Sequence, residues 1–126
     1  MDIKISYDDN TNQILSEFEK QLQIILEDMG TTAERHAKEK CPVDTGRLRN
    51  SITYATARFQ GVGTYSDNIG NSFSDGAARS VPSDKEVIIG TNVEYGQEIE
   101  LATHFLRDAV ANHVDEYKAL AKKWLG

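Results

Sequence analysis

The sequence contains one cysteine, two prolines and no long apolar run. With Cys41 alone, the chain cannot form an intramolecular disulfide or a cysteine-based metal site, so we expect it to reside in a reducing cytoplasm. The N-terminal stretch MDIKISYDDN lacks the basic and apolar regions of a signal peptide, and no segment is long enough to cross a bilayer. We therefore expect neither export by the usual signal nor a membrane partner.

Basic residues are too few for general nucleic-acid binding. Fourteen Lys and Arg face twenty Asp and Glu, which gives a formal net charge of -6. Because tight binding needs cations that neutralise phosphates, we expect at most non-specific proximity to DNA. The composition, with 39% hydrophobic and 27% charged residues, is typical of a folded protein. The length of 126 residues suits a single domain over residues 1–126.

Periodic patterns predict the first two elements. Ile3, Ile5 and Tyr7 alternate with polar residues, which is typical of a short strand. Apolar and small residues at spacings of three and four then predict an amphipathic helix to about Lys40. That helix is expected to carry Ile14, Phe18, Leu22, Ile25, Met29, Ala33, His36 and Ala37 on one face. Gly30 weakens its middle, where we expect a bend, and Pro42 ends it.

The rest of the chain predicts shorter elements. Residues 48–59 indicate a strand that one helical turn opens, and residues 85–91 indicate a second strand that pairs with it antiparallel. Between them, the Gly-, Ser- and Asp-rich segment 60–84 predicts a long mobile loop. A short helical turn is expected at 93–101. A last helix is expected to bury Leu106, Val110, His113, Tyr117, Leu120 and Trp124. The predicted fold class is α+β, with a small antiparallel sheet of about three to four strands packed with a long N-terminal helix and a C-terminal helix.

The segment Cys41–Ile52 is the strongest local signal in the sequence. Pro42 stops the helix, Asp44 and Thr45 can bond nearby backbone N–H groups, and Gly46 adopts a φ that other residues resist. Leu48 and Ile52 return the chain to the core. On chemistry alone, a well-made turn without further function is as good an interpretation as a functional one.

These residues resemble those of a phage tail-component family that includes tail-completion and head–tail joining proteins of long-tailed phages. One hallmark is Pro-x-Asp-Thr-Gly-x-Leu-x-x-Ser-Ile, a second is Gly-Thr-x-Val-x-Tyr, and a third is Pro-Phe-Leu-Arg-Pro-Ala. The matching positions are Pro42, Asp44, Thr45, Gly46, Leu48, Ser51 and Ile52; Gly90, Thr91, Val93 and Tyr95; and Phe105, Leu106, Arg107 and Ala109. His104 and Asp108 replace the two prolines of the third motif, and the Gly-rich segment before it is shortened, so local shape at 96–104 is the least determined.

The resemblance implies a structural protein of the virion that completes the tail or joins tail to head at the neck. It implies a homo-oligomeric ring around the DNA channel and contacts with neck or connector and tail-tube or tail-terminator proteins. The protein would be made in the host bacterial cytoplasm and need no cofactor. The motif residues would then define the fold, and exposed arginines would serve the interface: Arg47, Arg49, Arg58 and Arg79.

Other function classes stay open on the sequence. A non-virion binding module in the cytosol would engage a protein partner through the 60–84 loop. A catalytic pair of Cys41 and His36 lacks an orienting group and an oxyanion site, so we expect no enzyme. The two histidine sets, His104 with Asp108 and His113 with Asp115 and Glu116, show no metal-ligand spacing, and we expect no metal.

Overall fold

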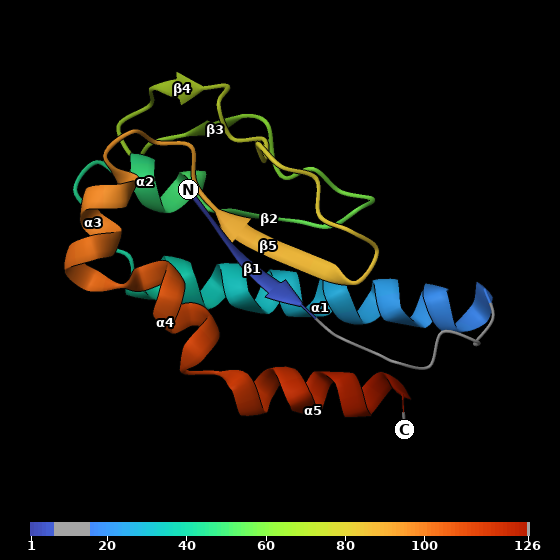
Figure 1. The fold of residues 1–126 in the computed structure, drawn as a ribbon. Helices are drawn as coiled ribbons and strands as arrows, with labels where there is room; N and C mark the ends of the chain where they lie inside the picture. Colours follow the sequence, from blue (N-terminus) through green and yellow to red (C-terminus); the bar gives the residue numbers. More distant parts are fainter. Residues whose placement is uncertain (7–15, 126) are drawn as a thin grey trace.

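The computed structural model describes residues 1–6 and 16–125 (Figure 1). Helices and strands alternate irregularly along this part of the chain, which confirms the predicted α+β class. The elements are β1 (Asp2–Ser6), α1 (Ser16–Lys40), α2 (Arg47–Ser51), β2 (Thr53–Ala55), β3 (Tyr65–Ser66), β4 (Ser72–Phe73), β5 (Glu86–Gly90), α3 (Gly96–Thr103), α4 (Phe105–Ala111) and α5 (Val114–Leu125). Within these residues, no helix is long and apolar enough to cross a membrane.

A three-stranded antiparallel sheet forms the centre, in the order β1-β5-β2. Ile89 of β5 lies opposite Ile3 on one side and Tyr54 on the other. The predicted antiparallel pairing of the segment 85–91 with the preceding strand is therefore confirmed. The expected strand at Ile3 and Ile5 is also present, whereas Tyr7 falls outside the described residues.

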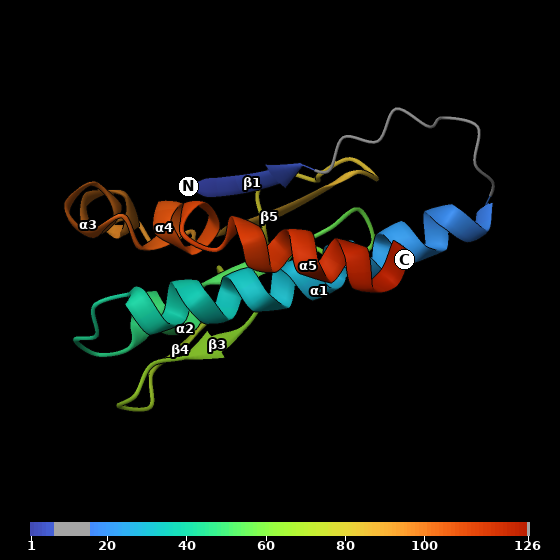
Figure 2. The same ribbon diagram turned by 90° about the horizontal axis from the view of Figure 1, so that it is seen from below.

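Helix α1 packs against β5 and β2, and α4 and α5 pack against α1 from another side (Figures 1 and 2). Val87 and Ile89 of β5 join the core that α1 fills with Leu22, Ile25, Leu26, Met29 and Ala33. Phe105 and Leu106 of α4 are fully buried in the same core. The seam predicted for the first helix thus forms the main apolar contact of the molecule, although Ile14 lies outside the described residues.

Gly30 allows α1 to approach the sheet closely. A Cβ atom at this position would lie 2.4 Å from Cδ2 of Tyr54 and 3.0 Å from Cγ2 of Val87. The helix runs as one element through Gly30 to Lys40, two residues before Pro42, as predicted for its end. The glycine that suggested a bend therefore provides room for the Tyr54 ring.

Residues 47–59 differ in part from the prediction. The expected helical turn is the five-residue helix α2, and the strand that follows covers only Thr53–Ala55. Leu48 and Ile52 are four residues apart, a spacing that fits one face of a helix as well as one face of a strand. This double fit explains why the strand was predicted too long.

The segment 60–84 contains a small antiparallel hairpin of β3 and β4, with Tyr65 opposite Phe73. Asp67 organises its tip, because its carboxylate accepts hydrogen bonds from the N–H groups of Ile69 (3.1 Å) and Asn71 (2.9 Å). The segment is therefore locally structured, and its mobility stays a prediction.

The single C-terminal helix of the prediction is wrong, because two helices form there. Helix α4 ends at Ala111 and α5 begins at Val114, with a turn at Asn112–His113. The helical turn expected at 93–101 is helix α3, and His104 joins it to α4 in the left-handed region at φ 56. The apolar spacing in the sequence runs on through this turn, because Leu106 of α4 and Tyr117 of α5 are both buried. It therefore did not reveal the break between the two helices.

Candidate protein–protein interface

The corner between α1 and α2 has the turn chemistry that its sequence predicts. Gly46 lies at φ 87, in the left-handed region. Thr45 Oγ1 accepts a hydrogen bond from the N–H of Arg47 at 3.3 Å, and the carbonyl of Thr45 accepts one from Asn68 of the hairpin at 2.7 Å. The corner is thus closed on itself and tied to the β3–β4 hairpin.

A buried chain of hydroxyl groups joins this corner to the segment after β5. The N–H of Val93 donates to Thr91 Oγ1 at 3.1 Å, and Ser51 Oγ donates to the carbonyl of Leu48 at 2.6 Å. The two hydroxyl oxygens lie 2.6 Å apart, so the Thr91 hydroxyl donates to Ser51. Two separate motifs of the sequence therefore meet in one hydrogen-bonded contact.

Arginines of α2 hold the hairpin against the corner. The Arg47 guanidinium lies 4.3 Å from the ring centroid of Phe73 and forms an ion pair with Asp75 at 3.3 Å. Arg49 donates to the side-chain oxygen of Asn68 at 3.1 Å. Two of the four arginines predicted as interface residues, Arg47 and Arg49, are therefore at least partly engaged within the chain.

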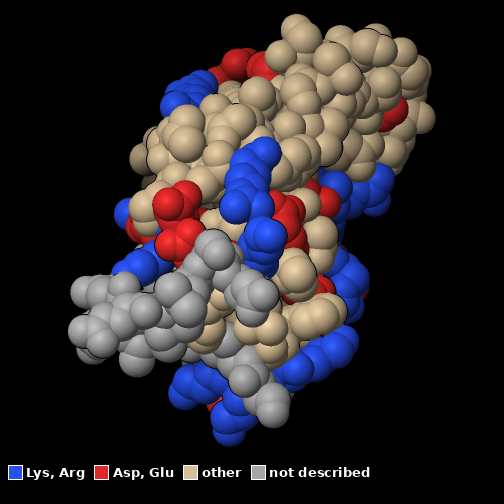
Figure 3. Space-filling model, turned by 90° about the vertical axis from the view of Figure 1, so that its right-hand side faces the viewer, with Lys and Arg blue, Asp and Glu red and all other residues tan. Residues whose placement is uncertain are grey.

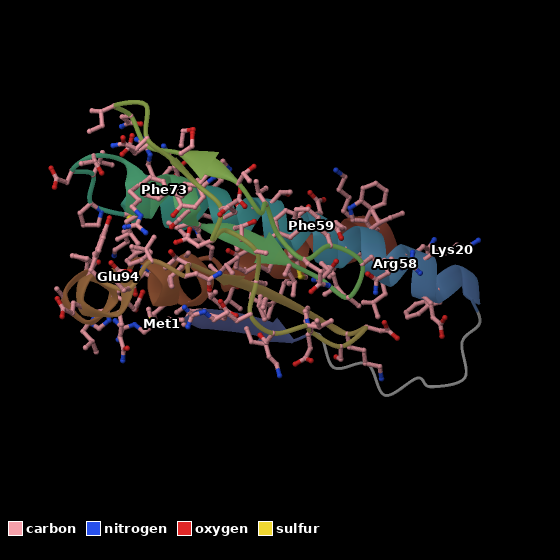
Figure 4. All side chains as sticks on the ribbon, turned by 90° about the horizontal axis from the view of Figure 1, so that it is seen from above. Met1, Lys20, Arg58, Phe59, Phe73 and Glu94 are labelled. Carbon is pink, nitrogen blue, oxygen red and sulfur yellow. The ribbon has the colours of Figure 1, made fainter. Side chains whose placement is uncertain are left out.

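The other two predicted arginines lie elsewhere. Arg58 lies far from Phe73 in Figure 4, toward the half of the molecule that holds the start of α1. Arg79 is exposed between Ala78 and Ser80, whose hydrogen bonds go to Gln60 and Asp2. The structure thus brings Arg47 and Arg49 together and leaves Arg58 and Arg79 outside the corner.

An apolar groove opens beside the corner, and we call it the corner groove. Its rim exposes Val43 by 50% and Tyr95 by 36%. The groove is lined by Pro42, Val43, Asp44, Thr45, Gly46, Arg47, Leu48, Tyr95 and Ile99. It lies between the corner that leads from α1 into α2 and the start of α3, elements that Figure 1 shows close together. Exposed apolar side chains in a concave site are typical of surfaces that bind other proteins.

The motif residues divide between the core and this groove. Ten of them are buried: Gly46, Leu48, Ser51, Ile52, Gly90, Thr91, Val93, Phe105, Leu106 and Ala109. Six line the groove: Pro42, Asp44, Thr45, Tyr95, and the buried Gly46 and Leu48. Arg107 is exposed on α4. Sequence reasoning treated the whole set as fold-defining and missed the groove.

Glu100 is a buried acidic residue that the sequence did not single out. Its Oε1 atom accepts a hydrogen bond from the N–H of Leu106 at 2.6 Å, at the start of α4. A carboxylate at a helix N-terminus satisfies free N–H groups and interacts favourably with the helix dipole. His104 stands where the third motif has its first proline, and proline could not adopt its φ of 56. The Glu100 carboxylate caps the start of α4 at this position.

The second missing proline is also explained by the backbone. Asp108 lies within α4, and its N–H donates to the carbonyl of His104 at 2.8 Å. Proline has no N–H and could not form this bond. The Asp108 side chain pairs with Lys40 of α1, and this hydrogen bond with Lys40 lowers the pKa of the Asp108 carboxyl.

The candidate catalytic and metal residues are arranged differently from the sequence-based pairs. Burial raises the pKa of the Cys41 thiol to about 11, which disfavours the reactive thiolate. His36 instead lies 2.5 Å from Glu116 and stacks on His113. His104 lies 3.6 Å from Glu100 rather than forming a set with Asp108. The structure thus adds His36 to His113 and Glu116, two members of one sequence-based set, whereas the sequence had paired His36 with Cys41.

Charged residues of both signs are mixed on the surface. Figure 3 views the end that carries the start of α1; basic and acidic side chains are mixed across the middle of this face, and basic side chains predominate along its lower edge. The upper half carries few charges. This face therefore carries charges of both signs.

Comparison with known families places these motifs in context. The family model described as "Bacteriophage HK97-gp10, putative tail-component" matches residues 7–101, well over half of the chain. The match includes the corner and the segment Gly90–Tyr95, and it ends before α4. No curated protein and no solved structure matches the chain. On the strength of the family match, the protein belongs to the HK97 gp10-like family of bacteriophage tail components.

Proposed function

We propose that this protein acts at the head–tail junction of the virion, where it completes the tail or joins it to the head. Membership in a tail-component family supports a structural role in the tail. The corner groove supports the more specific proposal of joining by protein contacts. It exposes Val43 and Tyr95 on a hydrogen-bonded corner, where a neighbouring subunit can bind them. The protein acts by contacts with other proteins and catalyses no reaction.

The partners in this proposal are copies of the same chain and the neighbouring neck, connector, tail-tube or tail-terminator proteins. A ring requires two different surfaces on each subunit, because its contacts are heterologous. The corner groove provides one surface. Ile69 at the hairpin tip, exposed by 71%, and Leu101 on α3, exposed by 70%, provide further apolar contacts.

Deletion of the gene tests the role in the particle. We expect lysates without the protein to contain filled heads and separate tails, with mature virions restored by the gene in trans. Mass spectrometry of purified wild-type virions should detect the chain. Normal virion yield after deletion, or absence of the chain from purified particles, would overturn the proposal and favour a cytosolic binding module.

A matched pair of substitutions tests the groove itself. Val43 lines the groove, whereas Val62 has a similar exposure of 52% and does not line it. A buried carboxylate in an interface is strongly unfavourable, so we expect Val43→Asp to lower the yield of joined particles at least about tenfold. Val62→Asp should complement the deletion normally. Equal complementation by the two variants would contradict a role for the groove.

A further inference from the structure

Two histidines and a glutamate converge where α5 meets α1. His36 comes from α1, His113 from the turn between α4 and α5, and Glu116 from the first turn of α5. One ligand atom of each lies within 4.8 Å of the others. The His36 and His113 rings are parallel, with centroids 3.5 Å apart, and His36 Nε2 lies 2.5 Å from Glu116 Oε1.

This donor set fits a particular class of ion. Imidazole nitrogens with one carboxylate oxygen suit Zn²⁺, whereas Mg²⁺ and Ca²⁺ prefer sites made of oxygen ligands. Three protein ligands leave a fourth tetrahedral position for water. A hollow in the surface provides that space, because His36 and His113 line it together with Lys40, Asp108 and Asn112.

We propose that His36, His113 and Glu116 bind one zinc ion and thereby clamp α5 to α1. This proposal is independent of the role at the head–tail junction. Ligand atoms of a tetrahedral zinc site lie about 3.3 Å apart, given bonds of about 2.0 Å, so small side-chain movements are enough. One ring must leave the stack, because parallel rings direct their lone pairs into separate planes. His113 is the ring that turns, since it lies in a turn and His36 is held within α1.

Nearby charges act on the site in opposite directions. Glu39 Oε2 lies 3.8 Å from His36 Nδ1, where a carboxylate can orient a zinc-bound imidazole. Arg35 Nη2 lies 4.0 Å from Glu116 Oε1 and competes for that carboxylate. The Arg35 side chain is 57% exposed and also contacts Glu39, so it can remain paired with Glu39 when zinc takes Glu116. Lys40 is already paired with Asp108 and adds little repulsion.

The test uses the full-length protein without an affinity tag, titrated with ZnCl₂ by isothermal calorimetry. We expect one zinc per chain and no binding of MgCl₂ under the same conditions. A ligand that binds the folded state alone raises its stability, so a hundredfold excess over the dissociation constant should raise the Tm by roughly 10 °C.

Three substitutions make the result specific. His113→Ala and Glu116→Gln change partly exposed side chains and should each weaken zinc binding at least about tenfold. His104→Asn is the matched control, because it removes the histidine outside the cluster and asparagine tolerates the left-handed backbone. It should leave the zinc affinity unchanged. Circular dichroism confirms that each variant is folded.

Several outcomes would overturn the proposal. These are the absence of stoichiometric zinc binding, equal affinity of the parent and the His113→Ala variant, and an equal loss with His104→Asn. Any of them would mean that the three side chains form a hydrogen-bonded contact between helices without a metal function. Histidine ring nitrogen shifts by NMR provide a second readout, because zinc binding should change those of His36 and His113 and leave those of His104 in place.

Discussion

At the scale of single residues, two hydroxyl groups connect the corner to the segment that follows β5. Ser51 and Thr91 are 2% and 3% exposed, so neither can bond to water if the other is lost. Their bonds run in one direction, from the N–H of Val93 through Thr91 and Ser51 to the carbonyl of Leu48. Each hydroxyl therefore both donates and accepts, and removal of one leaves two buried polar groups without partners.

Ser51→Ala should lower the free energy of unfolding by about 1–3 kcal/mol, the usual cost of leaving a buried polar group unpaired. Urea denaturation measures this difference. Ser66→Ala is the control, since Ser66 is exposed and its hydroxyl contacts only Ser72, at 3.3 Å. That variant should stay within about 0.5 kcal/mol of the parent. If both variants were equally stable, the hydroxyl chain would not contribute to the corner.

Cys41 gives a prediction about pH. Burial raises the pKa of its thiol from 9.0 to about 11, against an opposing effect of Arg49. A raised pKa keeps the thiol protonated, so at pH 8 the native protein should contain about a hundredth of the thiolate expected for the unfolded chain. The stability that the neutral thiol contributes is complete below about pH 9 and is lost as the pH rises toward about 11.

The measurement is the rate of labelling by a disulfide reagent in native buffer and in guanidinium chloride. We expect labelling of the native protein to be at least about a hundredfold slower at pH 8 and to accelerate as the pH rises. Rapid labelling of the native protein at pH 8 would show that the thiolate is accessible and would reopen a chemical role for Cys41.

At the scale of elements, Gly30 sets the distance between α1 and the sheet. Gly30→Ala improves helix propensity by about 1 kcal/mol. Its new methyl group, however, would lie 2.4 Å from the Tyr54 ring, whose hydroxyl is held by Glu27 at 2.7 Å. We expect overpacking to outweigh propensity and to lower the free energy of unfolding by about 1–2 kcal/mol.

Thr31→Ala is the control on the next residue of the same helix, where the side chain is exposed. It should be neutral or slightly stabilising, because alanine favours the helix. Chemical denaturation of both variants separates packing from propensity. A stabilised Gly30→Ala variant would show that the contact with Tyr54 relaxes at little cost.

The elements differ in how far the sequence alone predicted them. Helix α1 and strand β5 were predictable because each buries one periodic set of apolar residues, such as Leu22 and Met29 or Val87 and Ile89. The break between α4 and α5 was not, because Val110 and Tyr117 keep the helical spacing while Asn112 and His113 form a turn. Apolar spacing reports which side chains are buried and does not report the backbone between them.

The candidate sites follow the same physical division. The corner residues were found because Pro42, Thr45 and Gly46 act locally, through turn geometry. The corner groove needs Tyr95 and Ile99 from distant parts of the chain. His36 and Glu116 are 80 residues apart and approach only because α5 packs against α1. Sites built by tertiary packing therefore could not be predicted from spacing.

At the scale of the whole molecule, the two candidate sites occupy different places on one rigid frame. The corner groove lies between the α1–α2 corner and α3, and the histidine–glutamate cluster lies where the start of α5 meets α1; Figure 1 shows the arrangement of these elements. Both use the C-terminal end of α1, because that end leads into the corner and His36 lies about one turn before it. A substitution in one site should therefore leave the other measurable, which allows the two proposals to fail separately.

The charge of the whole molecule predicts how it behaves beside DNA. The net charge is -6, acidic and basic side chains both occur on the face in Figure 3, and Arg47 and Arg49 bind Asp75 and Asn68. Because the fourteen cations are outnumbered by twenty acidic groups, the molecule as a whole repels phosphates, and counterion release, the main source of non-specific affinity, is limited. In a gel-shift assay at about 0.15 M salt, micromolar protein should not retain double-stranded DNA, whereas a basic DNA-binding domain run in parallel should.

Lowering the salt to about 0.05 M should change this result little, because the salt dependence of binding grows with the number of phosphates neutralised. Binding with a steep salt dependence would contradict the expectation, since it would require a basic surface formed only on assembly or binding. A subunit that stands next to DNA without holding it is what a passage for DNA at a head–tail junction requires.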